Sequence, residues 1–387
     1  MQRAVIGTAA LSGLSYIGLL SASRSNGRLL RDIELLRNDR KTCPALPGLH
    51  DFKGVIHVHS NLSRDSEGTP EEIIRAAEET GQRFILLTDH NNRKIFAQGM
   101  QGRYGDVLVI RGAELIKGGQ ALLAVGIKEY VDGHSMTIQQ AVTAIKAQGG
   151  LAFVAHPWLF KEWEVEGIDG MEIYDIADST VAQIWKAPVM FADILTPGAE
   201  HPESVFLRGP LTRPDSYLSK WDGLTQKRKL VGIAGNDAHQ NVELFGRLID
   251  PYPLSFKFVQ SHILAPALNE PALMRALQAG HVYSSFGLLA DASGFQFSAR
   301  NEGLLGIMGD EVPVTARPVL TAQAPHVGLM RLYRNGQAIH EVTSDKLEYP
   351  VREKGVYRIE VALQIGGQQY PWIFSNPIYV ESPTAMI

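Results

Sequence analysis

Apolar residues between Asp51 and about residue 240 occur in short runs that alternate with amphipathic segments. Two of these segments, TPEEIIRAAEETG and TIQQAVTAIKAQGG, place apolar residues at helical spacing. Alternation of buried strands with helices predicts an α/β fold, and we expect a barrel whose strand ends carry the chemistry. The expected strands are GVIHVHS, RFILLTDH, VLVIRGAEL, ALLAVGI, LAFVAHP, GMEIYDI and KLVGIAGNDAH.

The first of the two helices has clear end signals. Thr69 is a good N-cap, Pro70 occupies the first helical position, and Glu72 is the third residue after the cap. Gly81 is a typical residue beyond a helix C-terminus. We therefore expect a helix that begins at Pro70 and ends shortly before Gly81.

From about Ala290 the pattern changes to short strands with turn residues and no helices between them. Asn335-Gly336 and Gly366-Gly367 are typical of hairpin turns. We interpret residues 291–387 as a β-sandwich domain that follows a barrel over residues 50–290.

The N-terminus has a different character, because residues 4–23 carry no charge. This stretch follows Arg3 and is typical of a signal peptide or a membrane anchor, so we assign residues 1–23 to that role and 24–49 to a linker. A buried apolar helix is the alternative, since Gly7, Gly13 and Gly18 dilute the hydrophobicity. The first interpretation predicts an exported (periplasmic or extracellular) or membrane-anchored protein, with a membrane tether or the secretion apparatus as partner.

Composition narrows the function classes. The chain has 387 residues, of which 45% are hydrophobic and 20% charged, and these are values of a globular protein. A net charge of −4 does not indicate a protein that binds duplex DNA. Cys43 is the single cysteine, so the chain has no internal disulfide partner and no thiolate metal cage.

Eight residues that can bind metals lie at or near the ends of expected strands. Five imidazoles with three carboxylates suit Zn, Mn or Fe better than Ca or Mg. Each short motif is weak alone, but their joint occurrence after apolar strands predicts a multinuclear hydrolase. They are His57, His59, Asp65, His90, Glu114, His156, Asp237 and His239.

Strand alternation predicts how some of these residues are presented. His57 and His59 would share one face while Val58 points away, and Asp237 and His239 would repeat this on a later strand. Glu114, at the end of its strand, is a candidate to bridge two ions, because a carboxylate offers two oxygens.

The series HVHS, TDHNN, GAEL, AHP and NDAH resembles the polymerase and histidinol phosphatase (PHP) superfamily of metal-dependent phosphoesterases over about residues 50–290. The resemblance implies a distorted seven-stranded (β/α) barrel and up to three ions. It implies that His57, His59, Glu114 and Asp237 hold one ion, and that Glu114 and His156 share a third. A further set, Asp65, His90 and His239, would hold the second ion.

One position departs from the pattern of the superfamily. Many relatives have a histidine in the strand after the glutamate motif, and this chain has Gln120 there. An amide oxygen is a weaker ligand than an imidazole. We therefore expect two well-occupied sites and a third that is loosely held or absent, with Mn, Zn or Fe as the ions.

Other residues are candidates for contacts around the ions. Arg64 would contact a substrate phosphate, or be simply solvated, and Trp158 would form a pocket wall. Asp89 would support a ligand or the fold. Glu172 would line the pocket or pack in the core, and Lys257 is expected on an alternating strand.

These observations predict a hydrolase that cleaves phosphoesters with a metal-activated hydroxide, as a phosphatase, a phosphodiesterase or a 5′-end nuclease. We assign catalytic roles to Asp237 and His239, the latter as a candidate proton donor to the leaving group. The expected substrate is small and phosphorylated, and short nucleotides or oligonucleotides are also possible substrates.

Two alternative functions also stay open. One is a carboxylic or carbamate ester hydrolase that uses the same ions, like the carbaryl-hydrolase branch that the chain resembles. The other is a non-catalytic metal-containing binding module.

Overall fold

The computed structural model describes residues 29, 31–183, 185, 207, 209–244 and 247–381. The uncharged stretch at residues 4–23, on which the expected signal peptide or anchor depends, lies outside these residues. Among the helices that the structure does describe, none is long and apolar enough to cross a membrane.

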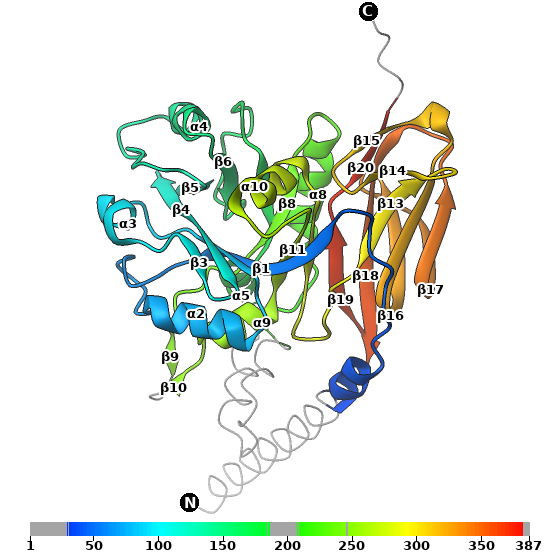
Figure 1. The fold of residues 1–387 in the computed structure, drawn as a ribbon, viewed down its shortest axis with the longest axis horizontal. Helices are drawn as coiled ribbons and strands as arrows, with labels where there is room; N and C mark the ends of the chain where they lie inside the picture. Colours follow the sequence, from blue (N-terminus) through cyan, green and yellow to red (C-terminus); the bar gives the residue numbers. More distant parts are fainter. Residues whose placement is uncertain are drawn as a thin grey trace, which may run out of the picture.

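The part of the chain that precedes the C-terminal strands is a mixed α/β unit (Figure 1). Residues 31–38 are helical and lead into this unit. Its strands are β1 (His50–Val58), β2 (Phe84–Leu87), β3 (Gly102–Tyr104), β4 (Val107–Lys117), β5 (Gln120–Val125), β6 (Leu151–Ala155), β7 (Gly170–Asp175), β8 (Val231–Gly235), β9 (Glu243–Leu244), β10 (Arg247–Leu248), β11 (Gln260–Ala265) and β12 (Val282–Ser285). Its helices are α2 (Pro70–Glu79), α3 (Arg93–Gln98), α4 (Ile138–Ala147), α5 (Ile176–Ala182), α8 (Asp215–Thr225), α9 (Tyr252–Phe258) and α10 (Glu270–Ala279).

Helix α2 begins as the sequence predicts. The Thr69 hydroxyl accepts a hydrogen bond from the Glu72 backbone N–H, and the Glu72 carboxylate accepts one from the Thr69 backbone N–H at 2.9 Å. These bonds satisfy two of the N–H groups that a helix N-terminus leaves without intrahelical partners. Thr137 and Gln140 form the same arrangement at the start of α4.

The strands that carry the candidate ligands are neighbours in the order β1, β2, β4, β5, β6, β7, β8. Most of these pairs are parallel, but β5 is antiparallel to both β4 and β6, and β4 turns directly into β5 without a helix. Residues just after β8 hydrogen-bond to β1, with Asn236 N–H donating to Ile56 C=O at 2.8 Å and His59 N–H to Ala238 C=O at 3.0 Å. The last strand of this series therefore lies beside the first.

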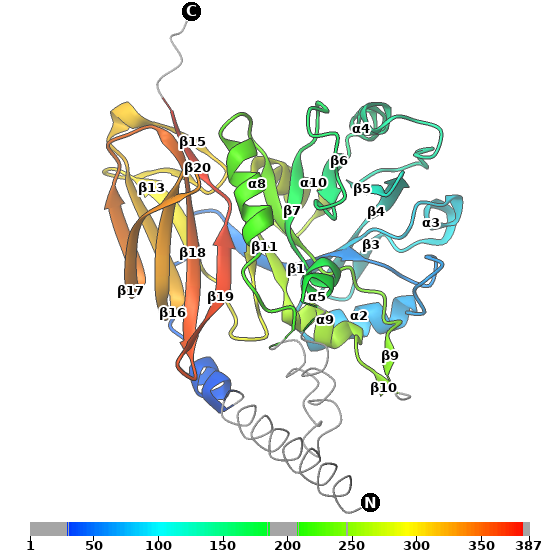
Figure 2. The same ribbon diagram turned by 180° about the vertical axis from the view of Figure 1, so that it is seen from behind.

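The C-terminal strands are consistent with the expected sandwich (Figure 2). The first half of β16 pairs with β13 and β17, and its second half pairs with β17 and β18, so one strand passes between two sets of neighbours. The two predicted hairpins are present, with positive φ at Asn335, Gly336, Gly366 and Gly367. The elements are β13 (Gln296–Arg300), β14 (Leu304–Ile307), β15 (Glu311–Pro313), η2 (Val314–Ala316), β16 (Val319–Arg334), β17 (Gln337–Pro350), β18 (Gly355–Ile365), β19 (Gln368–Ser375) and β20 (Ile378–Glu381).

The α/β part and the C-terminal strands pack against each other. Strand β12 pairs with β19, and one hydrophobic core contains residues of both parts, such as Val154 and Leu332. This continuity holds the α/β part in one orientation against the C-terminal strands.

The expectation of a strand at Lys257 is wrong. Lys257 lies in α9, and the strand that follows, β11, begins at Gln260. His262 on β11 has a structural role, because its two ring nitrogens bond to Asp51 Oδ1 at 2.9 Å and Ser285 Oγ at 3.0 Å.

Candidate metal centre

The fold brings the predicted ligands to one end of the neighbouring strands. His57 and His59 lie at the end of β1, His156 follows β6, and Asp237 and His239 follow β8. His90, after β2, forms an isolated bridge with Glu114. Glu114 does not end its strand as expected: it lies within β4, just past the point where β4 changes its partner from β2 to β5.

Three of the candidate ligands adopt a left-handed backbone conformation. The φ angles are 64° for His57, 47° for His156 and 43° for Asp237, a region that non-glycine residues rarely occupy. Such conformations cost free energy and cluster at functional sites. At these three positions the backbone therefore departs from regular strand geometry. Val58 and Ala238 nevertheless pack into the core as predicted.

Glu114 lies between two sets of histidines. Its Oε1 is 3.6 Å from Nε2 of His156 and 3.8 Å from Nε2 of His57. Its Oε2 is 2.8 Å from Nδ1 of His90 and 3.8 Å from Nε2 of His59. The two oxygens of one buried carboxylate thus face different ligand sets, which is the arrangement expected of a bridging ligand.

Asp237 and Asp65 complete the cluster. Oδ1 of Asp237 lies 3.4 Å from Nε2 of both His57 and His59. Asp65 is more exposed and lies 3.0 Å from Nε2 of His90 and 3.5 Å from Nε2 of His239. Groups with ligand atoms within 4.8 Å of one another include His59 with His90 and His239, His57 with His59 and Asp237, and His57 with Glu114 and His156.

The hydrogen-bond state of these side chains fits a divalent cation. His57 Nε2 and His59 Nε2 are buried and make no hydrogen bond among the described residues, and the buried His90 Nδ1 has Glu114 Oε2 at 2.8 Å as its neighbour. Buried polar atoms are nearly always satisfied, so each exception needs a physical explanation. Imidazole nitrogens and carboxylate oxygens that lie around one point are ligands suited to Zn, Mn or Fe.

The carboxylates and imidazoles shift one another's pKa strongly. Burial opposes charge on His57, but Glu172 and Asp237 outweigh it and hold the pKa of His57 well above its usual value. Burial likewise opposes charge on Glu114, yet His156, His57 and His90 hold the pKa of that carboxyl well below its usual range. Burial, with His239 and His57 nearby, lowers the pKa of His59 to about 4.

A second set of carboxylates lies behind the ligands on β7 and α5. The sequence analysis named Glu172 of this set as a pocket or core residue and did not assign Asp175 and Asp178. Glu172 Oε1 is 2.7 Å from Nδ1 of His57, and Asp178 Oδ1 is 3.0 Å from Nδ1 of His156. Asp175 lies between them, and burial together with Glu172 and Asp237 raises its pKa well above its usual value. The sequence did contain an indication of this set, because three carboxylates recur at intervals of three residues in MEIYDIAD.

His59 is oriented by a chain of hydrogen bonds. Its Nδ1 is 3.1 Å from Oγ of Ser63, and that hydroxyl donates to Asp89 at 2.7 Å. Asp89 also accepts from the backbone N–H of Ser60 at 2.6 Å. Asp89 therefore acts on the cluster through Ser63, in agreement with the expectation that it supports a ligand or the fold.

The two residues predicted to contact substrate differ in their surroundings. Trp158 is 60% exposed, and its indole N–H donates to Asp178 at 2.8 Å, so it stands beside the His156 side of the cluster. Arg64 is exposed in the loop next to Asp65.

Gln120 lies away from the cluster. It pairs with Lys117 at the turn between β4 and β5, whereas Glu114 pairs with Leu123 further along. Its amide oxygen accepts hydrogen bonds from the backbone N–H groups of Lys161 and Glu162. The inference that Gln120 replaces a ligand is wrong, because its side chain holds a surface loop.

Part of the chain is similar to known proteins. Residues 56–182 match the family described as PHP domain. An uncharacterized protein of Methanocaldococcus jannaschii is 25% identical over 119 residues, which cover 28% of this chain and 68% of that protein. A two-domain protein of Bacteroides vulgatus, described as containing a predicted PHP-like metal-dependent phosphoesterase, aligns with a TM-score of 0.43 and 13% identity, covering 87% of this chain and 98% of that one.

The matched segment contains six of the eight predicted ligands, and the structure brings Asp237 and His239 to them from β8. Residues 56–182 of the chain therefore carry a PHP domain, and this match supports the resemblance to the PHP superfamily.

Proposed function

We propose that this protein is a hydrolase that cleaves phosphoesters of small substrates with two or three divalent ions. The observation that carries the proposal is the position of Glu114, whose two oxygens face separate histidine sets at 2.8 to 3.8 Å. In this proposal the neighbour order β1 to β8, with β8 beside β1, is the distorted seven-stranded barrel of the superfamily.

The ligand sets follow from the groups that converge. His57, His59 and Asp237 would hold one ion, His90, His239 and Asp65 a second, and Glu114 and His156 a third, with Glu114 also reaching the second. When bound, the ions would neutralise the phosphoryl charge and lower the pKa of water toward about 7.

The chain's own residues have three tasks in this proposal. Glu172, Asp178 and Ser63 fix the ring orientation of His57, His156 and His59 through their Nδ1 atoms. His239, whose Nδ1 lies 3.0 Å from the Asp237 carbonyl oxygen, keeps Nε2 for the second ion, so this proposal does not retain the expected role of its ring as proton donor to the leaving group. Asp237 places one carboxylate oxygen, Oδ1, 3.4 Å from Nε2 of both His57 and His59.

Trp158 supports a second candidate function, hydrolysis of carboxylic or carbamate aryl esters at the same centre. Its exposed indole beside His156 offers a flat apolar surface to an aromatic group. Phe160 and Trp163 do not extend that surface, because Phe160 is buried and the two rings pack edge to face.

The test begins with elemental analysis of the purified full chain and of its His57→Ala variant. We expect at least two equivalents of Mn, Zn or Fe per chain, and fewer in the variant. Phenyl phosphate, bis-phenyl phosphate and phenyl acetate are then compared as substrates of the metal-loaded protein. Turnover of the acetate alone would replace the phosphoester proposal with the ester one. Absence of metal uptake by a folded protein would overturn both.

Export or membrane anchoring through residues 1–23 is a separate proposal. Its support is the uncharged stretch at residues 4–23. N-terminal sequencing of the protein from a membrane fraction and from an exported fraction would test it, and recovery of the intact chain in the cytosol alone would refute it.

A further inference from the structure

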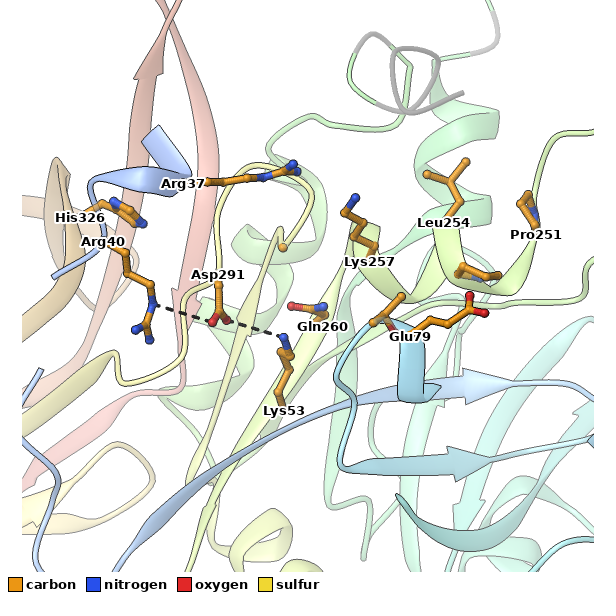
Figure 3. Close-up of a pocket in the computed structure, with 13 residues that line it drawn as sticks. Arg37, Arg40, Lys53, Glu79, Pro251, Leu254, Lys257, Gln260, Asp291 and His326 are labelled. Carbon is orange, nitrogen blue, oxygen red and sulfur yellow. Dashed lines mark ion pairs between the residues drawn. The ribbon is translucent and has the colours of Figure 1, made fainter. Parts of the chain in front are cut away.

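A pocket of about 680 Å³ lies where the α/β part meets the C-terminal strands and the helix at residues 31–38. Figure 3 shows Arg37 and Arg40 on one side of it, Lys257 and Leu254 on the other, and Gln260 between them. Lys53 lines the pocket from the beginning of β1, whereas the metal ligands of β1 lie at its other end. The pocket is therefore separate from the candidate metal centre.

Cations outnumber carboxylates in this pocket. Arg37, Arg40, Lys53 and Lys257 line it, together with Glu79 and Asp291. Asp291 lies 3.8 Å from both Arg40 Nε and Lys53 Nζ, and Figure 3 shows it between them. Burial opposes its charge, but Lys53 lowers the pKa of Asp291 to about 2, so one carboxylate is shared between two cations. Even without Lys257, which makes a further interaction of its own, the three other cations outnumber the two carboxylates.

Two buried polar side chains in the pocket wall have atoms without partners. His326 is 2% exposed, and neither of its ring nitrogens has a hydrogen-bond partner among the described residues. Gln260 is 3% exposed; its amide N–H donates to the Phe256 carbonyl at 3.1 Å, while its Oε1 is unpartnered. An unsatisfied buried polar group destabilises the protein, so the pocket carries polar groups suited to a ligand.

The surroundings of Gln260 and His326 determine which hydrogen-bond donors and acceptors these side chains present to a ligand. Gly287 leaves space for the Gln260 amide, because a Cβ there would lie 2.3 Å from Oε1. Burial and the charge of Arg40 lower the pKa of His326, so its neutral ring has one donor and one acceptor nitrogen. Leu254, Pro251 and Pro253 add an apolar side.

We propose that this pocket binds a small organic anion that carries a phosphate or carboxylate group on an apolar body. The anionic oxygens would contact Arg37, Arg40 and Lys53, and charge-assisted hydrogen bonds of this kind are the strong ones. The apolar body would lie against Leu254 and the two prolines, and a donor group on the ligand would satisfy Gln260 Oε1. The site is independent of the proposed hydrolytic function.

The test is calorimetric titration of the full chain with phenylphosphonate and, separately, with benzoate, before and after treatment with EDTA. These probes share an aromatic body and differ in the anion, so the arm that binds identifies the headgroup. We expect saturable binding of at least one probe, with one molecule per chain, and no change after EDTA.

Variants locate the binding. Lys53→Gln removes one cation from the pocket, and we expect the affinity for the probe to fall about tenfold or more, as for loss of a charge-assisted bond. Gln260→Leu, which removes the unpartnered oxygen at similar volume, should also change affinity. Lys128→Gln is the matched control, because this exposed lysine lies outside the pocket and its side chain is replaced in the same way.

Several outcomes would overturn the proposal. Binding of neither probe, an equal loss in Lys128→Gln, or unchanged affinity in both pocket variants would each do so. Loss of binding after EDTA would place the probe at the metal centre instead. Thermal melting of each variant verifies that a loss of binding is not a loss of fold.

Discussion

The carboxylate of Glu172 lies 2.7 Å from Nδ1 of His57, and both side chains are fully buried. This contact leaves Nε2 of His57 directed at Glu114 and Asp237. A carboxylate on the second nitrogen fixes the tautomer of a metal-binding histidine and raises its basicity. Glu172 is therefore a positioning residue for the candidate metal centre.

Replacing Glu172 by Gln should weaken metal binding without removing a ligand. The amide keeps the shape but loses the charge that orients His57, and such changes typically cost about 10- to 100-fold in metal affinity. Competition against a chromophoric chelator measures the effect. Glu166→Gln is the control, because Glu166 is exposed and its hydrogen bonds to the described residues are made by its backbone, to Gln139. Equal affinities of Glu172→Gln and the natural protein would contradict the role of Glu172.

Replacing Glu114 by Gln should have a larger effect, and it should reduce the number of ions bound. Glu114 faces histidines of both sets, so the amide loses the negative charge for both sets and offers an oxygen to only one of them. Elemental analysis after dialysis measures the stoichiometry. A variant that keeps all ions while losing affinity for one of them would show that Glu114 belongs to a single site.

Metal uptake should release protons and strengthen as pH rises. Burial opposes charge on His90, but Glu114 and Asp65 raise its pKa to about 9 in the metal-free protein, and the pKa of His57 is raised as well. A histidine must be neutral to bind a metal, so below about pH 9 His90 has to lose a proton first, and His57 must do the same while it is charged. Metal affinity should therefore increase from neutral pH to about pH 9.

Calorimetry at neutral pH in two buffers with different heats of ionisation measures this proton release directly. The His90→Gln variant should release fewer protons for each ion bound. An observed heat that does not depend on the buffer would show that the histidines are already neutral before the metal binds.

Arg358 should be important for stability, because it joins the α/β part to the C-terminal strands. Its guanidinium is 2% exposed and donates to Asp222 of α8 at 2.6 and 2.7 Å, and to Glu360 at 2.5 Å. Arg358→Ala leaves the buried Asp222 carboxylate uncompensated, and removal of one partner of a buried ion pair costs about 3–5 kcal/mol.

Denaturant unfolding measures the free energy of Arg358→Ala, with Arg331→Ala as its control. Arg331 pairs with the exposed Glu341 at 3.1 Å, and an exposed pair contributes about 0–1 kcal/mol. Equal losses in the two variants would contradict the role of the buried pair.

The local elements and the ligand residues were predictable from the sequence. Thr69 and Glu72 cap α2 as expected, and the hairpin at Asn335-Gly336 forms where the turn residues predict it. These features depend on a few neighbouring residues, and therefore short-range patterns report them. The eight candidate ligands could be named because each lies close to an apolar strand, and the structure brings them together; their binding of metal stays a prediction.

The tertiary structure alone decided how distant segments meet. The antiparallel position of β5, the approach of Glu172 and Asp178 to the histidines, and the convergence of Arg37, Lys53 and His326 on one pocket depend on strand pairings across the whole chain. Periodicity along one segment carries no information about which other segment it pairs with. The sequence by itself thus determined the local elements and the chemistry of the ligands, while packing of the sheets and helices determined which side chains support them.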